Sequence, residues 1–322
     1  MTRLLSRRTV LAALAATATF ALPSLVAAQT YPSKPITLVL PFPAGGSFDP
    51  IFRALANAAA QELGQPVVLM HKPGAGGVVG TAGLATQEAD GYTLAVMHNS
   101  VIRAPLVQKV SFDPLRDFTY VIGLAGLVTG ITVAADAPWK TLPELLADAK
   151  KRPGVISWGN VGAISINRIM AEQLAKAAGT RFNVVPFKGG GESFQALIGG
   201  HLDVYGDPGF GAQVKGGKVR LLATFTEQRL KKYDVPTVKE LGYDIVIQSP
   251  VGLVAPKNLD PKIAQRLHDA FRKAAADPEY LQQLDMFDMQ PGLMTGEAYA
   301  AYAREQFARE RKMLAEIGFK PQ

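Results

Sequence analysis

Cysteine is absent from the 322-residue sequence, and its absence excludes several kinds of chemistry at once. Disulfide bonds, a thiolate nucleophile and cysteine-ligated metals all require this residue. The fold must therefore be stabilised by an apolar core, and 48% hydrophobic with 19% charged residues is the composition of a folded globular chain. About 290 residues remain after the first 28, which is more than one core usually holds and favours two domains.

The sequence also lacks any long block of like charge. Its formal net charge is +7, but three arginines lie within residues 1–28, so the remainder carries +4. The densest basic groups are residues 150–152 and 231–232. Because a nucleic-acid binder usually gathers its basic residues on one face, we expect no nucleic-acid partner. Weak attraction for anions is all that this balance supports.

No apolar run near the start is long enough to anchor the chain permanently in a membrane. Residues 10–22 are apolar, which is shorter than the about 20 residues that span a bilayer. A basic start precedes this run and Val26-Ala27-Ala28 follows it, the order of a secretory signal peptide. We expect residues 1–28 to be removed after Ala28 and the mature protein to lie in the periplasm. Residues 6–11 resemble a twin-arginine export signal, and an ordinary secretion signal with two adjacent arginines is the alternative.

The rest of the chain alternates short β-branched runs with amphipathic segments. The first expected strands are 36–40, 67–70 and 93–97, with helices over 51–63 and 78–89. This order predicts an α/β fold whose parallel sheet has helices on its faces. A second series begins at Gly130, with strands expected at 130–135, 155–159, 182–187, 202–205 and 220–224, and helices over 141–151, 166–178 and 193–198.

The second series predicts a second lobe. We expect one α/β lobe formed by residues 29–129 and 251–322, and another formed by residues 130–250. A return strand at 251–255 and two or three helices would complete the first lobe. A chain that leaves one lobe and returns to it has two crossing segments, which is the usual construction of a hinge.

Glycine-rich loops follow the expected strands, where ligands of open α/β sheets bind. They are residues 45–47 and 74–77 in the first lobe, and 162–165 and 189–191 in the second. Such loops can present backbone N–H groups and the positive end of a helix to an anion, or can simply be tight turns with capping residues. Ser47 fits an N-cap, while Asp49 complements the helix start or contacts a ligand. Lys188 either pairs with an anion or stays solvated.

Motifs of the common enzyme classes are missing. The dinucleotide and P-loop glycine patterns, the H-E-x-x-H zinc motif and the G-x-S-x-G elbow do not occur. We expect no enzyme, catalytic residue, metal or cofactor. The rival hypothesis, an exported hydrolase, would need His98 as the base for Ser47, Ser100 or Ser165. The aromatic residues Phe42 and Trp158 lie at strand ends beside the loops and could line a pocket, although core packing is their commoner role.

Ten segments, in order along the mature chain, resemble the tripartite tricarboxylate transporter substrate-binding proteins, the Bug or TctC family. They are YPSKPI at 31–36, PFPAGGSFD at 41–49, LGQPVV at 63–68, KPGAGG at 72–77, ADGYTL at 89–94, FDP at 112–114, VPFKG at 185–189, GGHLD at 199–203, DVPTVKELG at 234–242 and GLVAP at 252–256.

The resemblance implies a two-lobed periplasmic-binding-protein fold of the type II, Venus-flytrap kind. It also implies a small carboxylate ligand, either an organic or an aromatic acid, held by backbone amides and water, and delivery to membrane permease subunits. A sensor kinase is the alternative partner, and we expect a monomer. The predicted ligand-binding residues, with Asp207 added by the resemblance, are Phe42, Ala44, Gly45, Gly46, Ser47, Asp49, Ala75, Gly76, Gly77, Asn99, Ser100, Asn160, Gly162, Ala163, Ser165, Lys188, Gly189, Gly190 and Asp207.

Three departures from the family pattern concern the ligand. Residues 160–167 replace a Ser- or Thr-rich loop with a nearby His, Phe48 stands where Thr is common, and His71-Lys72 replaces Asn-Arg. The second lobe becomes less polar, which favours a ligand with an apolar or aromatic body over citrate. Calorimetry with citrate and with terephthalate or benzoate analogues would contradict this hypothesis if only the tricarboxylate bound.

Overall fold

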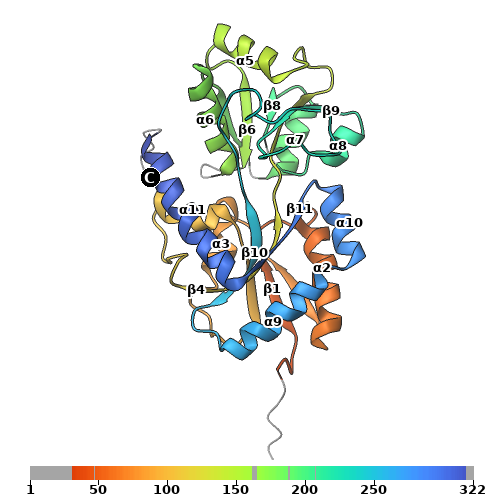
Figure 1. Cartoon of the computed structure of the whole chain (residues 1–322), viewed down its shortest axis with the longest axis vertical. Helices are drawn as coiled ribbons and strands as arrows, with labels where there is room; N and C mark the ends of the chain where they lie inside the picture. Colours follow the sequence, from red (N-terminus) through yellow and green to blue (C-terminus); the bar gives the residue numbers. More distant parts are fainter. Residues whose placement is uncertain (1–30, 47, 162–164, 188, 207, 317–322) are drawn as a thin grey trace, which may run out of the picture.

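Two β-sheets, each flanked by helices, form two lobes that lie end to end along the long axis of the molecule (Figure 1). The computed structural model describes residues 31–46, 48–161, 165–187, 189–206 and 208–316. Within these ranges no helix is long and apolar enough to cross a membrane. The fold class predicted from the sequence, a two-lobed α/β fold, is confirmed.

The first lobe is built on a six-stranded sheet in the order β11-β4-β10-β3-β1-β2. Its strands are β1 (Ile36–Leu40), β2 (Val67–His71), β3 (Thr93–Met97), β4 (Phe118–Gly126), β10 (Pro250–Pro256) and β11 (Gln290–Thr295). Strand β1 pairs in parallel with β2 and β3, so the carboxyl ends of these three strands meet at one edge. The returning strand β10 runs antiparallel between β3 and β4.

The second lobe is built on a five-stranded sheet in the order β7-β6-β8-β5-β9. Its strands are β5 (Gly130–Ala134), β6 (Ser157–Val161), β7 (Asn183–Phe187), β8 (Val204–Tyr205) and β9 (Val219–Thr224). Strand β6 is parallel to β7 and β8, which again brings several carboxyl ends to one edge. Trp158 is fully buried on β6 and packs on Phe182, so it belongs to the core of this lobe.

The helices start and stop where local chemistry predicts. They are α2 (Phe48–Leu63), α3 (Val78–Ala82), α4 (Asn99–Val107), α5 (Leu142–Lys151), α6 (Ile166–Ala178), α7 (Gly190–Ile198), α8 (Gly211–Lys215), α9 (Pro261–Ala274), α10 (Pro278–Met286) and α11 (Gly296–Glu316), with a 3₁₀ turn η1 at Ala75–Gly77. Thr141 caps α5 by accepting from the Glu144 N–H, and Glu144 accepts in return from the Lys140 N–H, which is a capping box. Asp260 and Asp277 cap α9 and α10.

Several elements differ from the sequence expectation. Strands β4 and β11 and helix α4 were not predicted, and residues 99–100 lie in the first turn of α4 rather than in a loop. Helix α4 contains Pro105 and has no side-chain cap, so it carries neither start signal nor regular pattern. The helix expected over 78–89 ends at Ala82, since Gly80 and Gly83 weaken it. Helix α7 begins at Gly190, three residues earlier than expected.

Two neighbouring chain segments connect the lobes (Figure 1). One lies between β4 and β5 and the other between β9 and β10. They are hydrogen-bonded to each other, because Leu127 N–H donates to Ser249 O at 2.8 Å and Phe225 N–H donates to Thr129 O at 3.0 Å. This short paired connection leaves the facing edges of the two sheets opposite one another.

Candidate functional site

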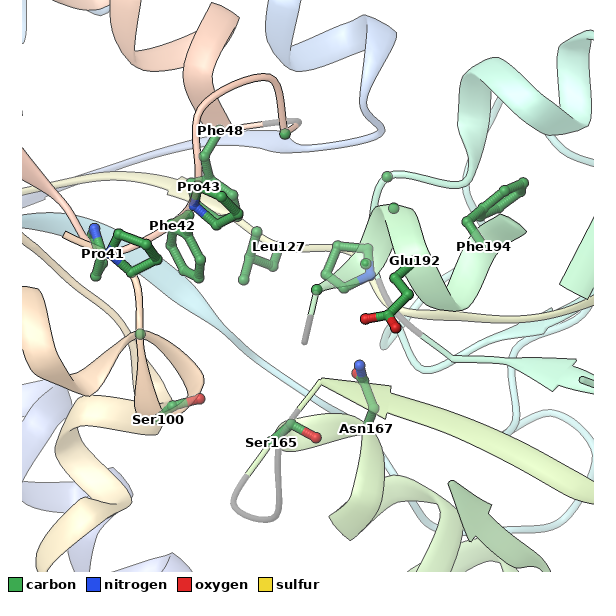
Figure 2. A pocket seen from close by; sticks show the side chains of 18 of the residues that line it. Pro41, Phe42, Pro43, Phe48, Ser100, Leu127, Ser165, Asn167, Glu192 and Phe194 are labelled. Carbon is green, nitrogen blue, oxygen red and sulfur yellow. The ribbon is translucent and has the colours of Figure 1, made fainter. Parts of the chain in front are cut away.

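A cavity of about 660 Å³ lies between the lobes, and both lobes line it (Figure 2). Its volume is within the range of about 300–1,000 Å³ that is typical of small-molecule sites. The first lobe contributes the loops after β1 and β2 and the start of α4. The second lobe contributes the starts of α6 and α7 and the segment after β8.

Ten of the predicted ligand-binding residues line this cavity. They are Phe42, Ala44, Gly45, Gly46, Ala75, Gly77, Ser100, Ser165, Gly189 and Gly190. Three others, Asp49, Asn99 and Asn160, are described but are not among the lining residues. Of Gly76 only its place in the η1 turn is described. The remaining five, Ser47, Gly162, Ala163, Lys188 and Asp207, lie outside the described residues.

An aromatic stack forms the first-lobe wall. The rings of Phe42 and Phe48 are 4.2 Å apart between centroids and nearly parallel, at 24°. Phe48 continues the stack onto Phe52, and Phe42 is tilted against the His98 ring at 5.1 Å. Phe48 therefore contributes apolar surface to this wall of the cavity.

Asp49 holds the loop that carries this stack. Its carboxylate accepts from the Gly45 N–H at 3.1 Å and from Arg53 at 2.8 Å, and it lies 3.3 Å from His71 Nε2. Partial burial opposes ionisation, but the Gly45 N–H and Arg53 outweigh it and lower the pKa of Asp49. His71 Nδ1 is also 3.1 Å from Phe42 O. These contacts stabilise the loop between β1 and α2, which is a role that the sequence analysis did not predict for Asp49.

His98 is buried behind the stack, at the start of α4. Burial lowers the pKa of His98 to about 4, and the backbone of Gly77 opposes this shift only in part. Gly77 has φ +91°, and a Cβ there would lie 2.5 Å from His98 Nε2. Among the described residues, Nε2 has no hydrogen-bond partner, so no described serine is paired with it. The hydrolase hypothesis needs such a pair.

Asn99 and Asn160 support the cavity from behind. Asn99 donates to Gln248 O at 2.9 Å and accepts from the Tyr302 hydroxyl at 3.1 Å, which ties α4 to a crossing segment and to α11. The same helix is held by a buried ion pair of 2.6 Å between Arg103 and Glu310. Asn160 is buried near the end of β6.

The second-lobe wall has a different character. The Ser165 hydroxyl accepts from the Arg168 N–H at 3.4 Å and so caps α6. Asn167, in the first turn of the same helix, is 0% exposed, and neither its amide nitrogen nor its amide oxygen has a hydrogen-bond partner among the described residues. Glu192 lies in the first turn of α7 and points toward Asn167 in Figure 2. Glycines 189 and 191 have open space around them.

Sequence reasoning missed several residues that line the cavity. They include Leu127, Asn167, Glu192, Phe194, Tyr205 and Phe287. Asn167 follows a predicted loop by two residues and Glu192 follows another directly, so the helix starts themselves were the usable signal. Phe287 follows α10, far away in the sequence, and no local pattern indicates that it would reach the site. Trp158, which could have lined a pocket, is instead in the core.

Four helices begin at the cavity wall: α2, α4, α6 and α7. Helix starts carry partial positive charge and unpaired N–H groups. Among the described lining residues Glu192 is the only side chain with a formal charge, since His98 is neutral near pH 7. The described residues contain no group of three His, Cys, Asp or Glu that could hold a metal ion.

Two lobes that enclose a cavity at the carboxyl ends of their strands define a solute-binding protein. The model of the tripartite tricarboxylate transporter family receptor, TctC, matches residues 51–319. The chain belongs to this family, whose members are solute-binding receptors of tricarboxylate-type transporters.

Individual relatives agree over almost the whole chain. The UPF0065 protein in the gbd 5′ region of Cupriavidus necator is 44% identical over 98% of this chain and 97% of its own length. A structure of the periplasmic binding protein BugD is 27% identical, with a TM-score of 0.84, over 91% of this chain and 100% of its own. MatC from Rhodopseudomonas palustris with bound malate is 25% identical, with a TM-score of 0.79, over 88% of this chain and 100% of its own.

Proposed function

We propose that this receptor captures a small carboxylate in the cavity between its lobes. The observation that carries the proposal is the convergence of four helix starts on a cavity whose described walls have no cationic side chain. Backbone N–H groups and helix dipoles can bind a carboxylate in such a place without a buried arginine or lysine. The malate bound by MatC supports the same ligand class.

The ligand has one apolar region. Phe42, Phe48, Leu127, Phe194 and Phe287 line the cavity beside four prolines. Burial of apolar surface contributes about 25 cal/mol per Å², so a hydrocarbon or aromatic body gains affinity from these side chains and citrate does not. The sequence departures at Phe48 and at residues 160–167 point the same way.

The binding residues act from both sides. The first lobe, residues 29–129 and 251–322, supplies Phe42, Ala44–Gly46, Ala75–Gly77 and Ser100, with Ser47 at the helix start. The second lobe, residues 130–250, supplies Ser165 and Gly189–Gly190, with Gly162, Ala163, Lys188 and Asp207 in the adjoining loops. Asp49, Asn99 and Asn160 act behind the walls as supports. Ligand binding then draws the lobes together about the paired crossing segments, since only the closed form makes both sets of contacts.

The protein acts as a monomeric periplasmic receptor that hands its ligand to membrane permease subunits. Residues 1–28 form the export signal, by the twin-arginine or the general route. A sensor kinase is the second possible partner, and genes for permease subunits beside this one would distinguish the two. Neither catalysis nor a cofactor is required for this function.

A thermal-shift screen tests the proposal. The purified mature chain is heated with a library of mono-, di- and tricarboxylates and with the methyl ester of each acid. A ligand bound only by the native state raises the melting temperature, and the rise grows with the logarithm of the ratio of ligand concentration to Kd. We expect at least one carboxylate to raise it and its ester to have no effect. Stabilisation by esters and acids alike would contradict recognition through the carboxylate.

A further inference from the structure

The His71 ring lies between two hydrogen-bond acceptors of the first-lobe wall. Its Nδ1 is 3.1 Å from the Phe42 carbonyl oxygen, and its Nε2 is 3.3 Å from Asp49 Oδ1. The Asp49 carboxylate is ionised, because partial burial opposes ionisation but the Gly45 N–H and Arg53 outweigh it and lower the pKa. A neutral imidazole carries one N–H and can donate to only one of the two acceptors. An imidazolium carries two N–H groups and can donate to both.

The two acceptors lie at opposite ends of a segment that lines the cavity. Residues 42 and 44–46 line it after strand β1, and Asp49 lies in the first turn of α2. Asp49 also accepts from the Gly45 N–H at 3.1 Å, in the middle of this segment. Because His71 belongs to strand β2, its imidazolium ties both ends of the segment to that strand. The neutral ring ties only one end.

The charged groups around the ring determine how pH acts on this connection. Asp49 favours the imidazolium, while Arg53 of the same helix opposes it; Arg53 bonds to the same carboxylate oxygen and is 58% exposed, so solvent screens its charge. Lys72, the next residue, is exposed, and the neighbouring strand β1 has no charged residue. His98, behind Phe42, stays neutral down to about pH 4 because burial lowers its pKa to about 4.

We propose that His71, in its doubly protonated form, is a positioning residue of the first-lobe wall, so that the receptor binds its carboxylate more tightly in mildly acidic than in alkaline surroundings. This inference rests on the proposed function and adds a regulation of the same site. As pH rises, the ring loses a proton and with it one of its two contacts. The ligand must then order the segment itself, and the cost of that ordering weakens binding.

Calorimetric titration of the mature chain provides the test, with benzoate and hexanoate as probes. The titrations run from pH 5.5 to pH 8, the range in which a histidine changes charge. Both probes are ionised throughout, since a carboxyl group titrates near pH 4. We expect the Kd to rise by about fivefold over this range, the effect of one partly exposed hydrogen bond to a charged group. A rise of less than about twofold, or tighter binding at pH 8, overturns the inference.

Two substitutions assign the pH dependence to one histidine. His71→Gln keeps an N–H donor but cannot gain a proton, so its Kd should be independent of pH between 5.5 and 8. His201 is exposed and does not line the cavity, so His201→Gln should keep the pH profile of the parent. A purely structural role of His71 would shift the affinity equally at every pH. A parental profile in His71→Gln, or a flat profile in His201→Gln, overturns the inference.

Hydrogen exchange without ligand separates the inference from the proposed function. After correction for the intrinsic pH dependence of exchange, backbone amides of residues 42–46 should be about fivefold less protected at pH 8 than at pH 5.5, and equally protected at both in His71→Gln. Protection that does not change with pH in the parent overturns the inference, whatever binds. If neither probe binds at any pH but the protection changes as expected, the proposed function fails and the positioning role of His71 stands.

Discussion

The two walls of the cavity use glycine in different ways. In the first lobe, Gly77 has positive φ, and the position that a Cβ would take is occupied by the His98 ring. In the second lobe, Gly189 and Gly191 have nothing within 4 Å of that position, although for Gly190 between them the Tyr205 hydroxyl is 3.2 Å away. Gly45 of the first lobe is as open as Gly189. The contrast therefore lies between the loop after β2, which is packed against His98, and the start of α7, which is mostly open.

Polar groups show a weaker contrast. On the first-lobe side, Asp49 and Asn99 are each hydrogen-bonded to at least two partners, and Arg103 pairs with Glu310. His98 Nε2, on the same side, is buried without a partner among the described residues. On the second-lobe side, both amide atoms of Asn167 are buried without a partner among the described residues. Each wall therefore contains a buried polar side chain with an unused hydrogen-bonding atom.

The largest expected effect is a loss of stability when the buried ion pair that holds α4, on the first-lobe side of the cavity, is broken. Arg103 and Glu310 are 0% and 2% exposed, and their side chains connect α4 to α11. Arg103→Leu leaves a buried carboxylate without its cation, so the free energy of unfolding should fall by about 3–5 kcal/mol in urea titrations. The double variant with Glu310→Leu removes both charges and should recover most of that loss. A single variant as stable as the parent would show that the pair does not hold α4.

The second prediction concerns pH and His98. Burial lowers the pKa of His98 from 6.5 to about 4, so between these values the unfolded chain binds a proton that the folded chain does not. Stability is fully present above pH 6.5 and is lost as pH falls toward 4, by about 3 kcal/mol from this group. Urea midpoints measured from pH 7 to pH 4 should fall less steeply for His98→Gln. Equal slopes would contradict a neutral buried imidazole.

The glycine contrast is tested by paired substitutions. Gly77→Ala introduces a Cβ at positive φ and into contact with His98, so we expect a loss of about 1–3 kcal/mol in stability and weaker ligand binding. Gly191→Ala lies in the first turn of α7 with open space around it, and should be neutral or stabilising by up to about 1 kcal/mol. Similar losses for both variants would remove the distinction between the walls.

The smallest expected loss of stability comes from removing one hydrogen bond between the lobes, outside the cavity. The Tyr233 hydroxyl of the second lobe donates to Asp288 of the first lobe at 2.7 Å, and Lys232 Nζ lies 2.9 Å from the same carboxylate oxygen. Because Lys232 still pairs with Asp288, Tyr233→Phe should cost only about 1 kcal/mol. The ligand dissociation rate, measured by stopped flow, should rise in this variant, since the contact favours the closed lobes. An unchanged rate would mean that the contact does not contribute to closure.

Much of the fold could be predicted from the sequence, because periodicity and caps report local structure. The glycine loops mark the ends of parallel strands, and these ends necessarily meet at a sheet edge. Strand β11 could not be predicted, because QPGLMT contains Pro and Gly and is a strand only through its pairing with β4. Phe287 lines the cavity and Asp288 contacts the second lobe. Both positions result from tertiary packing, so no local sequence pattern predicts them.

The candidate site was predicted less completely than the fold. Loop glycines at the cavity were found because their backbone role has a sequence signature. Asn167 and Glu192 were missed because a polar residue in the first turn of a helix is usually only a cap or a dipole partner. That Asn167 is completely buried at the cavity, and that Glu192 lines it from the other helix, only the three-dimensional arrangement shows.

A crystal structure of the protein with its tightest-binding carboxylate tests the central claim most directly. The account predicts one ligand in contact with both walls, its carboxylate accepting from backbone N–H groups at the helix starts and its apolar body against Phe42. A ligand that touches only one lobe, or one whose carboxylate makes no contact with those N–H groups, would contradict it.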